Sequence, residues 1–414
     1  MEVRIHRGAC QVAGGTVIEV AAEDKRLVLD VGMPMRRTPH RDLLPDVPGL
    51  WADGDSSLLG VLVTHSHPDH VGLADLVAPS VPVHMGAAAE RIRDAASFFW
   101  PGARSFELAE GFVHRKPLEL GPFTVTPMEV DHCAYDAHAL LIEAGGRSLL
   151  YTGDIRAHGR RGETLRELAR EAHGVDAVLM EGTSLGPWNA GRSSHSEQDV
   201  EEQCVDTFTH TRGAVLAFFA TQNLDRLVTL YRAARRSGRT FVMDLYTATV
   251  AKAAGDPRIP TADSPGVAVY LPRSQKMRVV ETEEFWRTED VRENRIYPDQ
   301  LAARADGLVI TCRARMLSEL DRVDCLEGAG AVWSMWPGYL DNDHGEEFRQ
   351  DLRRLGIPWV VHHASGHAYP EDLERFAQAL GARRVVPVHT SAPEAFAEHF
   401  AHVEQRADGE WWSV

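Results

Sequence analysis

The sequence predicts an α/β protein in which a separate α/β domain interrupts a β-rich layered domain. In the first 182 residues, short Val- and Leu-rich runs bounded by Gly, Pro or Asp are typical of buried strands. From residue 213 onward, strand-like and helical segments alternate at the spacing of a parallel α/β unit. A third observation, a loop with three histidines and an aspartate in six residues, indicates a site that could bind metal ions.

The first domain is predicted from a succession of short strands with a helix at 86–99 outside them. The expected strands are 15–23 (GTVIEVAAE), 25–32 (KRLVLDVG), 58–65 (LLGVLVTH), 81–86 (VPVHMG), 122–132 (PFTVTPMEVDH), 138–146 (HALLIEAGG), 147–154 (RSLLYTGD) and 176–182 (DAVLMEG).

A polar, Gly- and Ser-rich connection at 182–198 separates the strand-rich first part of the chain from the part in which strands and helices alternate. After it we expect a helix at 197–211 capped by Ser196, strands at 213–220, 240–247, 307–312 and 330–336, and an amphipathic helix at 223–238. A buried strand at 359–366, a helix at 370–380 and a strand at 384–390 follow. These patterns predict a first domain over 1–190, an insertion over 191–350 and a return to the first domain over 351–414.

Composition narrows the class of protein. Charged residues at 25% and hydrophobic residues at 44% are typical of a soluble globular chain, and no apolar run is long enough to span a membrane. The five cysteines are scattered and the N-terminus does not resemble a signal peptide, so we expect a cytoplasmic location. The net charge of −16 argues against an extensive nucleic-acid surface, although bound metal ions would make a local site positive.

The strand at 58–63 leads into the most informative segment, which carries His65, His67, Asp69 and His70. Imidazole nitrogens and carboxylate oxygens are the ligands that zinc and related metals prefer. In an irregular loop, alternate residues point to opposite sides, so we expect His65 and His67 to reach one ion and Asp69 and His70 to reach a second. Two adjacent ions form a hydrolytic centre, because bound water becomes hydroxide near neutral pH.

Three further strands deliver ligand-type side chains at their ends. The strand at 122–130 is followed by Asp131 and His132, the strand at 147–151 leads to Asp154, and the strand at 384–388 leads to His389. A histidine at the end of a single strand is most often an ordinary half-buried side chain. Three such strand ends beside a ligand-rich loop instead indicate a metal centre.

Together, these residues resemble the motifs of the metallo-β-lactamase superfamily. The resemblance implies that His65, His67 and His132 hold one ion, that Asp69, His70 and His389 hold a second, and that Asp154 bridges them. Asp30, which ends the strand in LVLDVG, would fix the tautomer of a histidine from behind the ligands. As an alternative, Asp30 is a plain turn residue before Gly32.

The inserted region resembles the β-CASP nucleases, the branch that contains ribonuclease J. The matches are Glu181 in VLMEGTS, His367 in Ser365-Gly366-His367-Ala368, and His389, which is a histidine in the RNA-acting members. NLDR at 223–226 and RARMLSEL at 313–320 also look like ribonuclease J. The resemblance implies a metallo-β-lactamase αββα sandwich with an inserted β-CASP α/β domain. It departs in one respect, since we expect no counterpart of the further C-terminal domain of ribonuclease J.

The resemblance assigns catalytic roles to Asp69, Asp154, His367 and Glu181, with His367 donating a proton or steadying phosphate and Glu181 orienting it. Contacts to substrate are expected from Ser365, Gly366, Arg226 and Arg313. As alternatives, His367 is a structural turn residue, Glu181 caps a helix, and Arg226 belongs to a solvated helix face.

We therefore expect a ribonuclease with two Zn²⁺ ions, or Mn²⁺, that hydrolyses RNA in an interdomain cleft through a metal-activated hydroxide. Its partner would be single-stranded RNA and not a membrane, and a homodimer is one form it could take. Two alternatives stay open: a hydrolase of small phosphodiesters or (thio)esters, and a binding protein without turnover.

Overall fold

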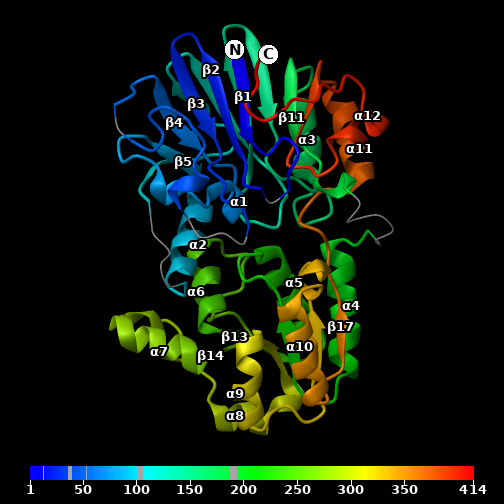
Figure 1. The fold of residues 1–414 in the computed structure, drawn as a ribbon. Coiled ribbons are helices and arrows are strands. Elements are labelled where there is room, and N and C mark those ends of the chain that lie inside the picture. Colours follow the sequence, from blue (N-terminus) through cyan, green and yellow to red (C-terminus); the bar gives the residue numbers. More distant parts are fainter. Residues whose placement is uncertain (13, 36–39, 53, 101–105, 187–193) are drawn as a thin grey trace. The chain divides into compact units, whose positions relative to one another are not determined.

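The computed structural model describes residues 1–12, 14–35, 40–52, 54–100, 106–186 and 194–414 (Figure 1). The chain divides into two compact units, of which the first comprises 1–93, 104–194 and 366–414 and the second 94–103 and 195–365. The predicted domain boundary at 190/191 lies outside the described residues. The predicted boundary at 350/351 falls inside the second unit, because the strand Trp359–Val361 pairs with the sheet of that unit.

Two sheets form the first unit, and each combines parallel with antiparallel pairs. The order of the first sheet is β19 (Trp411–Ser413), β1 (Glu2–Arg7), β2 (Val17–Ala22), β3 (Lys25–Leu29), β4 (Leu58–Leu62), β5 (Val83–Gly86), β6 (Leu108–Phe112). The order of the second sheet is β18 (Val385–Val388), β11 (Ala177–Glu181), β10 (Arg147–Tyr151), β9 (His138–Ala144), β8 (Phe123–Glu129), β7 (Leu118–Leu120).

The central strands of the two sheets are buried on both faces, which is why strands such as β4 and β11 are largely apolar. In β3, Leu27 and Leu29 pack into the core shared by the two sheets, whereas Val28 packs into the core on the opposite face. In β10, Leu149 joins the shared core and Leu150 joins the outer one. This alternation follows from the two-residue period of a strand.

Helices cover the outer faces. The outer core of the second sheet includes residues of α3 (Glu163–Glu171), α11 (Pro370–Leu380) and α12 (Phe396–His399). The outer core of the first sheet includes residues of α1 (Pro68–Val71) and α2 (Ala87–Ser97), and α2 continues into the second unit. The predicted α/β sandwich, with helices outside two packed sheets, is therefore confirmed.

The second unit is built on a six-stranded parallel sheet. Its order is β14 (Val267–Tyr270), β13 (Thr240–Asp244), β15 (Leu308–Thr311), β12 (Val215–Phe218), β16 (Gly330–Trp333), β17 (Trp359–Val361). The helices are α4 (Glu197–His210), α5 (Leu224–Arg236), α6 (Leu245–Ala253), α7 (Arg273–Thr282), α8 (Pro298–Ala303), α9 (Leu317–Arg322) and α10 (Asp343–Arg354). Ser196 caps α4 as predicted. Its hydroxyl oxygen accepts a hydrogen bond from the backbone N–H of Asp199, and its own backbone N–H donates to the carboxylate of Asp199.

Two details of the second unit differ from the prediction. The strand expected at 240–247 ends at Asp244, whose side chain accepts from the N–H of Thr247 and so begins α6. The segment after residue 358 is not a buried strand, because β17 lies at the edge of its sheet and leaves Val360 and Val361 exposed. Among the helices of the described residues, none combines the length and apolar character needed to cross a membrane.

Candidate metal centre

The histidine-rich segment follows β4 and is attached to the end of the neighbouring strand β3. The backbone N–H of Thr64 donates to Oδ1 of Asp30 at 2.7 Å. The segment is not irregular throughout, as the sequence suggested, because Pro68–Val71 forms one helical turn. Proline suits the first position of a helix, where its missing N–H has no helical partner to lose. Asp69 therefore projects from a helical turn and not from an extended loop.

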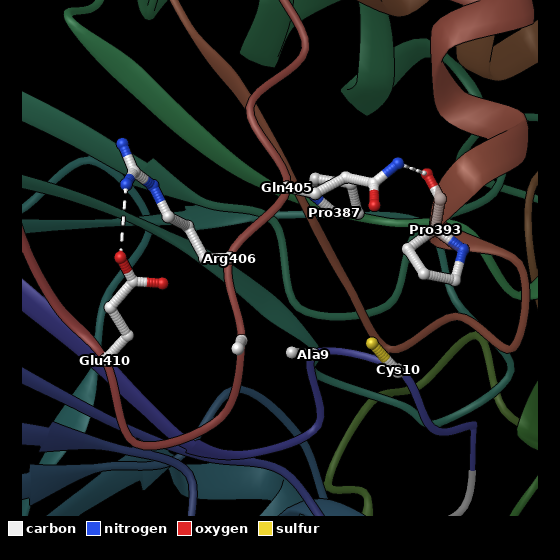
Figure 2. A pocket seen from close by; sticks show the side chains of 8 residues that line it. Ala9, Cys10, Pro387, Pro393, Gln405, Arg406 and Glu410 are labelled. Atoms are coloured by element: carbon white, nitrogen blue, oxygen red, sulfur yellow. Dashed lines mark hydrogen bonds and ion pairs between the residues drawn. The ribbon is translucent and has the colours of Figure 1, made fainter.

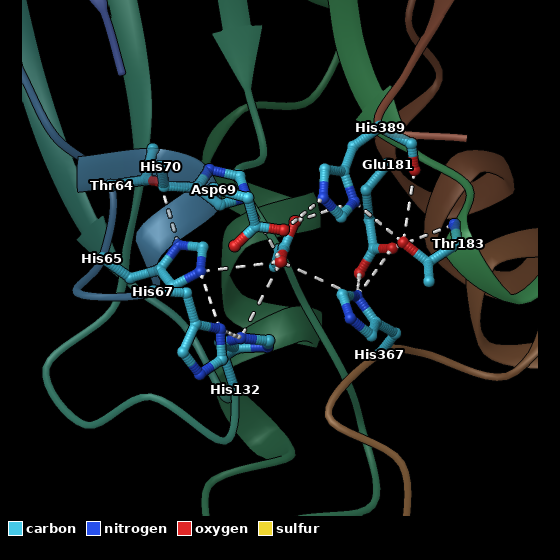
Figure 3. Close-up of polar contacts among 12 residues, drawn as sticks. Thr64, His65, His67, Asp69, His70, His132, Glu181, Thr183, His367 and His389 are labelled. Carbon is cyan, nitrogen blue, oxygen red and sulfur yellow. Dashed lines mark hydrogen bonds and ion pairs between the residues drawn. The ribbon is translucent and has the colours of Figure 1, made fainter. Parts of the chain in front are cut away.

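All seven side chains predicted as metal ligands gather within the first unit (Figure 3). They form two groups, in each of which the ligand atoms lie within 4.8 Å of one another: His65, His67, His132 and Asp154 in the first, and Asp69, His70 and His389 in the second. The parallel arrangement of β10, β11 and β18 explains part of this convergence, because the carboxyl ends of parallel strands share one edge.

Asp154 connects the two groups. Its Oδ2 lies 3.6 Å from Nε2 of His65 and 3.8 Å from Nε2 of His132 in the first group. The same oxygen lies 3.4 Å from Nε2 of His70, and Oδ1 lies 3.4 Å from Nδ1 of His389. One buried carboxylate therefore faces ligand atoms of both groups, as a bridging ligand must.

The donor set fits a pair of divalent metal ions. Nε2 of His70 and Oδ1 of Asp154 are buried and have no hydrogen-bond partner, although buried polar atoms normally have one. The chemistry of five imidazoles and two carboxylates suits zinc, and also manganese where carboxylates contribute.

Electrostatics act differently on the individual ligands. Burial alone would lower the pKa of His70, but Asp154 and Asp30 outweigh it and raise that pKa well above the usual range. Burial holds the pKa values of His65 and His132 well below the usual range, and neighbouring imidazoles lower them further. Burial alone would raise the pKa of Asp154, but the nearby His389 and His70 reverse this and lower it. Neutral imidazoles and an ionised carboxylate are the states that coordinate a metal.

Asp30 lies behind the ligands, completely buried. Its Oδ2 accepts from Nδ1 of His70 at 2.7 Å and from the hydroxyl of Tyr151 at 2.6 Å. The hydroxyl of Thr64 lies 3.0 Å from the same oxygen. These contacts orient His70 with Nε2 towards the cluster and do not fit the alternative of a plain turn residue.

Left-handed backbone occurs at three positions around the cluster. Asp30 has φ of 56°, His389 has φ of 48° and Gly153 has φ of 53°. Such conformations cost free energy in residues other than glycine, and they concentrate at functional sites. At Gly153 a side chain is also excluded by space, because a Cβ there would lie 2.9 Å from Cβ of Thr64.

His367 and Glu181 form a pair at the edge of the cluster. Nδ1 of His367 lies 3.1 Å from both carboxylate oxygens of Glu181 and 3.8 Å from Oδ2 of Asp154. Glu181 is held in turn by the backbone N–H of Ile155 at 2.9 Å. Burial opposes protonation of His367, but Glu181 and Asp154 outweigh it and raise its pKa to about 9. The structure thus brings together the two residues that the sequence paired.

The predicted substrate contacts are placed less favourably. The carbonyl of Gly366 accepts from Nδ1 of His132 at 2.6 Å, so this residue supports a ligand. Ser365, Arg226 and Arg313 belong to the second unit.

Arg226 does not lie on a solvated helix face and does not present its guanidinium to solvent. Its side chain is fully buried and binds Glu197 through Nε at 3.1 Å and Nη2 at 2.9 Å. The phosphate contact predicted for Arg226 is therefore corrected to a structural ion pair. Arg313 is one-third exposed, and its Nε donates to Asp244 at 3.0 Å.

Three further residues that the sequence did not single out support the cluster, two by contact with a predicted ligand and one through Asp30. Thr64 Oγ1 lies 3.0 Å from Nδ1 of His65, and Thr183 Oγ1 lies 2.9 Å from Nδ1 of His389. The third, Tyr151, reaches the cluster through Asp30. Each lies at or just beyond the end of a strand that leads to a ligand, and this position is the only signal that the sequence offered.

A pocket of about 320 Å³ lies beside β18 and the turn that follows β1 (Figure 2). Its lining residues are Ala9, Cys10, Pro387, Pro393, Gln405, Arg406, Ala407 and Glu410. Pro387 precedes His389 by two residues, so the pocket adjoins a strand of the candidate metal centre. None of its lining residues is among the predicted ligands.

Comparison with known proteins agrees with this geometry. Residues 26–219 match the model of the Beta-lactamase superfamily domain. A protein of unknown function from Enterococcus faecalis V583 has a crystal structure with a TM-score of 0.81, covering 100% of this chain and 99% of that one at 22% identity. This second likeness shows the fold alone.

Ribonuclease J proteins are among the relatives in sequence. The chain is 25% identical over 397 residues to ribonuclease J of Mycobacterium tuberculosis strain H37Rv, covering 88% of this chain and 64% of the relative. It is 23% identical over 230 residues to ribonuclease J of Helicobacter pylori strain 26695, covering 52% of this chain and 32% of the relative. An RNase J-like protein of Methanocaldococcus jannaschii is 23% identical over 260 residues, or 58% of this chain and 56% of that protein.

The matched segments thus span from about a third to two-thirds of the length of these curated relatives. The match at 26–219 includes Asp30, the histidine-rich segment, His132, Asp154 and Glu181. Residues 26–219 therefore match the Beta-lactamase superfamily domain, and up to 88% of the chain is similar in sequence to a ribonuclease J.

Proposed function

We propose that the protein is a metal-dependent ribonuclease that hydrolyses phosphodiester bonds of single-stranded RNA. The observation that carries the proposal is the position of Asp154, whose carboxylate faces ligand atoms of both groups. Two adjacent metal sites that share a carboxylate suit the hydrolysis of phosphate esters, because attacking and leaving oxygens can both be stabilised. The similarity to ribonuclease J in two bacteria supports RNA as the substrate.

The first ion would be held by His65, His67 and His132, the second by Asp69, His70 and His389, with Asp154 shared between them. When bound, zinc or manganese would supply the Lewis acidity that activates water and offsets the charge of a phosphate. Asp30 and Thr64 keep ring nitrogens directed at the ions by holding the opposite nitrogen of His70 and His65.

His367 is the candidate proton donor. Glu181 holds Nδ1 of this imidazole, and we assign to Nε2 the donation of a proton to the oxygen that leaves phosphorus. Its side chain is 22% exposed, whereas that of Asp154 is 1% exposed. Of His367 and Asp154, His367 is therefore the side chain that a substrate can reach from solvent.

Purified protein loaded with Zn²⁺ or Mn²⁺ tests the proposal. It should be offered 5′-labelled single-stranded RNA, DNA of the same sequence, and bis-p-nitrophenyl phosphate in parallel. We expect RNA to be cleaved much faster than DNA, and the activity to disappear with a chelator and return with metal. Equal rates on RNA and DNA, or turnover of the small ester alone, would contradict the ribonuclease assignment. Retention of metal without turnover of any substrate would favour a binding protein.

Two other properties stay predictions from the sequence: the homodimer and the cytoplasmic location. Size-exclusion chromatography with light scattering decides the first, and subcellular fractionation decides the second.

A further inference from the structure

Four of the five ligand histidines are held through the ring nitrogen that does not take part in the proposed coordination. The partners differ: a threonine hydroxyl for His65 and for His389, the carboxylate of Asp30 for His70, and the carbonyl of Gly366 for His132. Such partners fix the tautomer and the orientation of a metal ligand. The fifth histidine, His67, therefore raises the question of what holds it.

The geometry of His67 identifies which of its nitrogens faces the ion site. Nδ1 lies 3.2 Å from Nε2 of His65 and 3.2 Å from Nε2 of His132, so three ring nitrogens converge on one point. Nε2 of His67 lies 3.7 Å from Sγ of Cys133, the same distance that separates this sulfur from Nε2 of His132. That distance is within the range of a hydrogen bond to sulfur.

We propose that Cys133 is a positioning residue that orients His67 for metal binding. A neutral imidazole that coordinates through Nδ1 carries its proton on Nε2, and this N–H donates to Sγ of Cys133. Cys133 then completes the set, so that every ligand histidine has a protein partner on its second nitrogen. The inference rests on the proposed metal centre but does not depend on RNA being the substrate.

Packing holds the sulfur at this position. A methyl group in place of a hydrogen of Gly366 would lie 2.6 Å from Sγ of Cys133 and 3.5 Å from Cε1 of His132. Glycine at 366 therefore leaves the space that Cys133 occupies, while its carbonyl holds His132. The carbonyl of Gly366 and the sulfur of Cys133 thus lie beside His132 and His67, two of the three histidines of the first group.

Metal affinity measured without a nuclease assay tests the proposal. Zn²⁺ competition with a chromophoric chelator should show that Cys133→Ala binds the more weakly held ion about 10–100-fold less tightly than the wild type, the usual effect of losing such a partner. Cys133→Ser should keep most of the affinity, because a hydroxyl is close to alanine in volume but accepts a hydrogen bond. Cys10→Ala is the matched control, since this exposed cysteine lines the pocket outside the cluster.

The Co²⁺-loaded protein separates positioning from direct ligation. We expect its near-ultraviolet spectrum to lack a thiolate-to-cobalt charge-transfer band, and the visible bands of Co²⁺ to change in Cys133→Ala but not in Cys10→Ala. A charge-transfer band that Cys133→Ala removes would make the residue a ligand and overturn the proposal. Unchanged affinity in Cys133→Ala would overturn it too, as would equal losses in the serine and alanine variants.

Gly366→Ala provides an independent check through the same sulfur. The added methyl group must displace Sγ of Cys133, so this variant should also bind metal more weakly. In the Cys133→Ala background the space is open, and the second substitution should cost much less. Simple additivity of the two losses would show that Gly366 acts apart from Cys133 and would count against the proposal. A failure of the RNA assay leaves all of these metal measurements interpretable.

Discussion

At the scale of single residues, Asp154 is the side chain on which the two ligand groups both depend. It is almost fully buried, and its two oxygens lie 3.4–3.8 Å from nitrogens of five histidines, four of which are predicted ligands. Its removal should therefore affect metal binding and catalysis together.

We expect Asp154→Ala to lose its activity and to retain fewer than the about two metal ions per chain of a dinuclear site. The reason is that the ligand shared by the two groups is missing, so that Asp69 is the only predicted carboxylate ligand left for the five imidazoles. Elemental analysis after gentle dialysis measures the metal content. Asp24→Ala, at a side chain that is 82% exposed, is the control and should resemble the wild type. Full metal content in Asp154→Ala would exclude a bridging role.

His367→Ala should behave differently, because this residue is proposed to donate a proton and not to hold a metal. We expect metal content to stay unchanged while kcat falls by about 10²–10⁴-fold, as for the loss of a general acid. Parallel measurement of bound metal and single-turnover rates checks this. If His367→Ala loses metal, the residue is a ligand or a structural element of the site and the proton-donor assignment is wrong.

At the scale of elements, the turn after β10 depends on a glycine. Gly153 combines φ of 53° with the close approach to Thr64, whereas Gly145, in the turn between β9 and β10, has φ of 57° and nothing within 4 Å of an added Cβ. We expect Gly145→Ala to lower the free energy of unfolding by about 1–2 kcal/mol, the cost of left-handed backbone alone.

Gly153→Ala should lower the free energy of unfolding by more than Gly145→Ala, and it should also weaken metal binding, because Thr64 holds His65. Urea unfolding of both variants, with metal affinity as the second readout, separates the contribution of the backbone from that of the close contact. Equal destabilisation in the two variants would mean that Thr64 yields to the added methyl group without consequence.

The connection between α4 and α5 depends on a buried ion pair. Arg226 binds Glu197, and its Nη1 also donates to the carbonyl of Ser334 at 2.7 Å. We expect Arg226→Ala to lower the free energy of unfolding by about 3–5 kcal/mol, since Glu197 is left buried and uncompensated. Urea unfolding measures this. If Arg226→Ala were as stable as the wild type but bound RNA more weakly, Arg226 would instead contact phosphate, as the sequence suggested.

At the scale of the whole molecule, the net charge of −16 limits how RNA can be bound. Affinity should come from a few phosphates, because an extensive basic surface is not available to a chain with 60 acidic and 44 basic side chains. We expect log affinity to fall with log salt at a slope of about −1.4 to −2.8, which corresponds to about two to four phosphate contacts on a single strand. Fluorescence anisotropy with a catalytically inactive variant measures it. A much steeper slope would reveal a basic face.

The sequence by itself determined the sandwich and the set of candidate ligands. Runs of Val and Leu predict strands such as β3 and β10, and in these strands successive side chains pack into the cores on opposite faces of the sheet. Parallel strands of one sheet place their carboxyl ends at one edge, so the ligand-type residues that follow β10 and β18 are expected to meet there, whereas those that follow β4 come from the other sheet.

Only the tertiary structure decided how those residues are supported and which arginines are accessible. Arg226 looked like part of a basic helix face, yet it is buried because Glu197, far from it in sequence, compensates its charge. Cys133 is one of five scattered cysteines to which the sequence assigns no role, but its sulfur lies beside Nε2 of His67. Contacts of this kind join segments that are distant along the chain, and local sequence patterns carry no record of them. Local periodicity therefore determines strands and strand ends, whereas the packing of remote segments determines which side chains meet there.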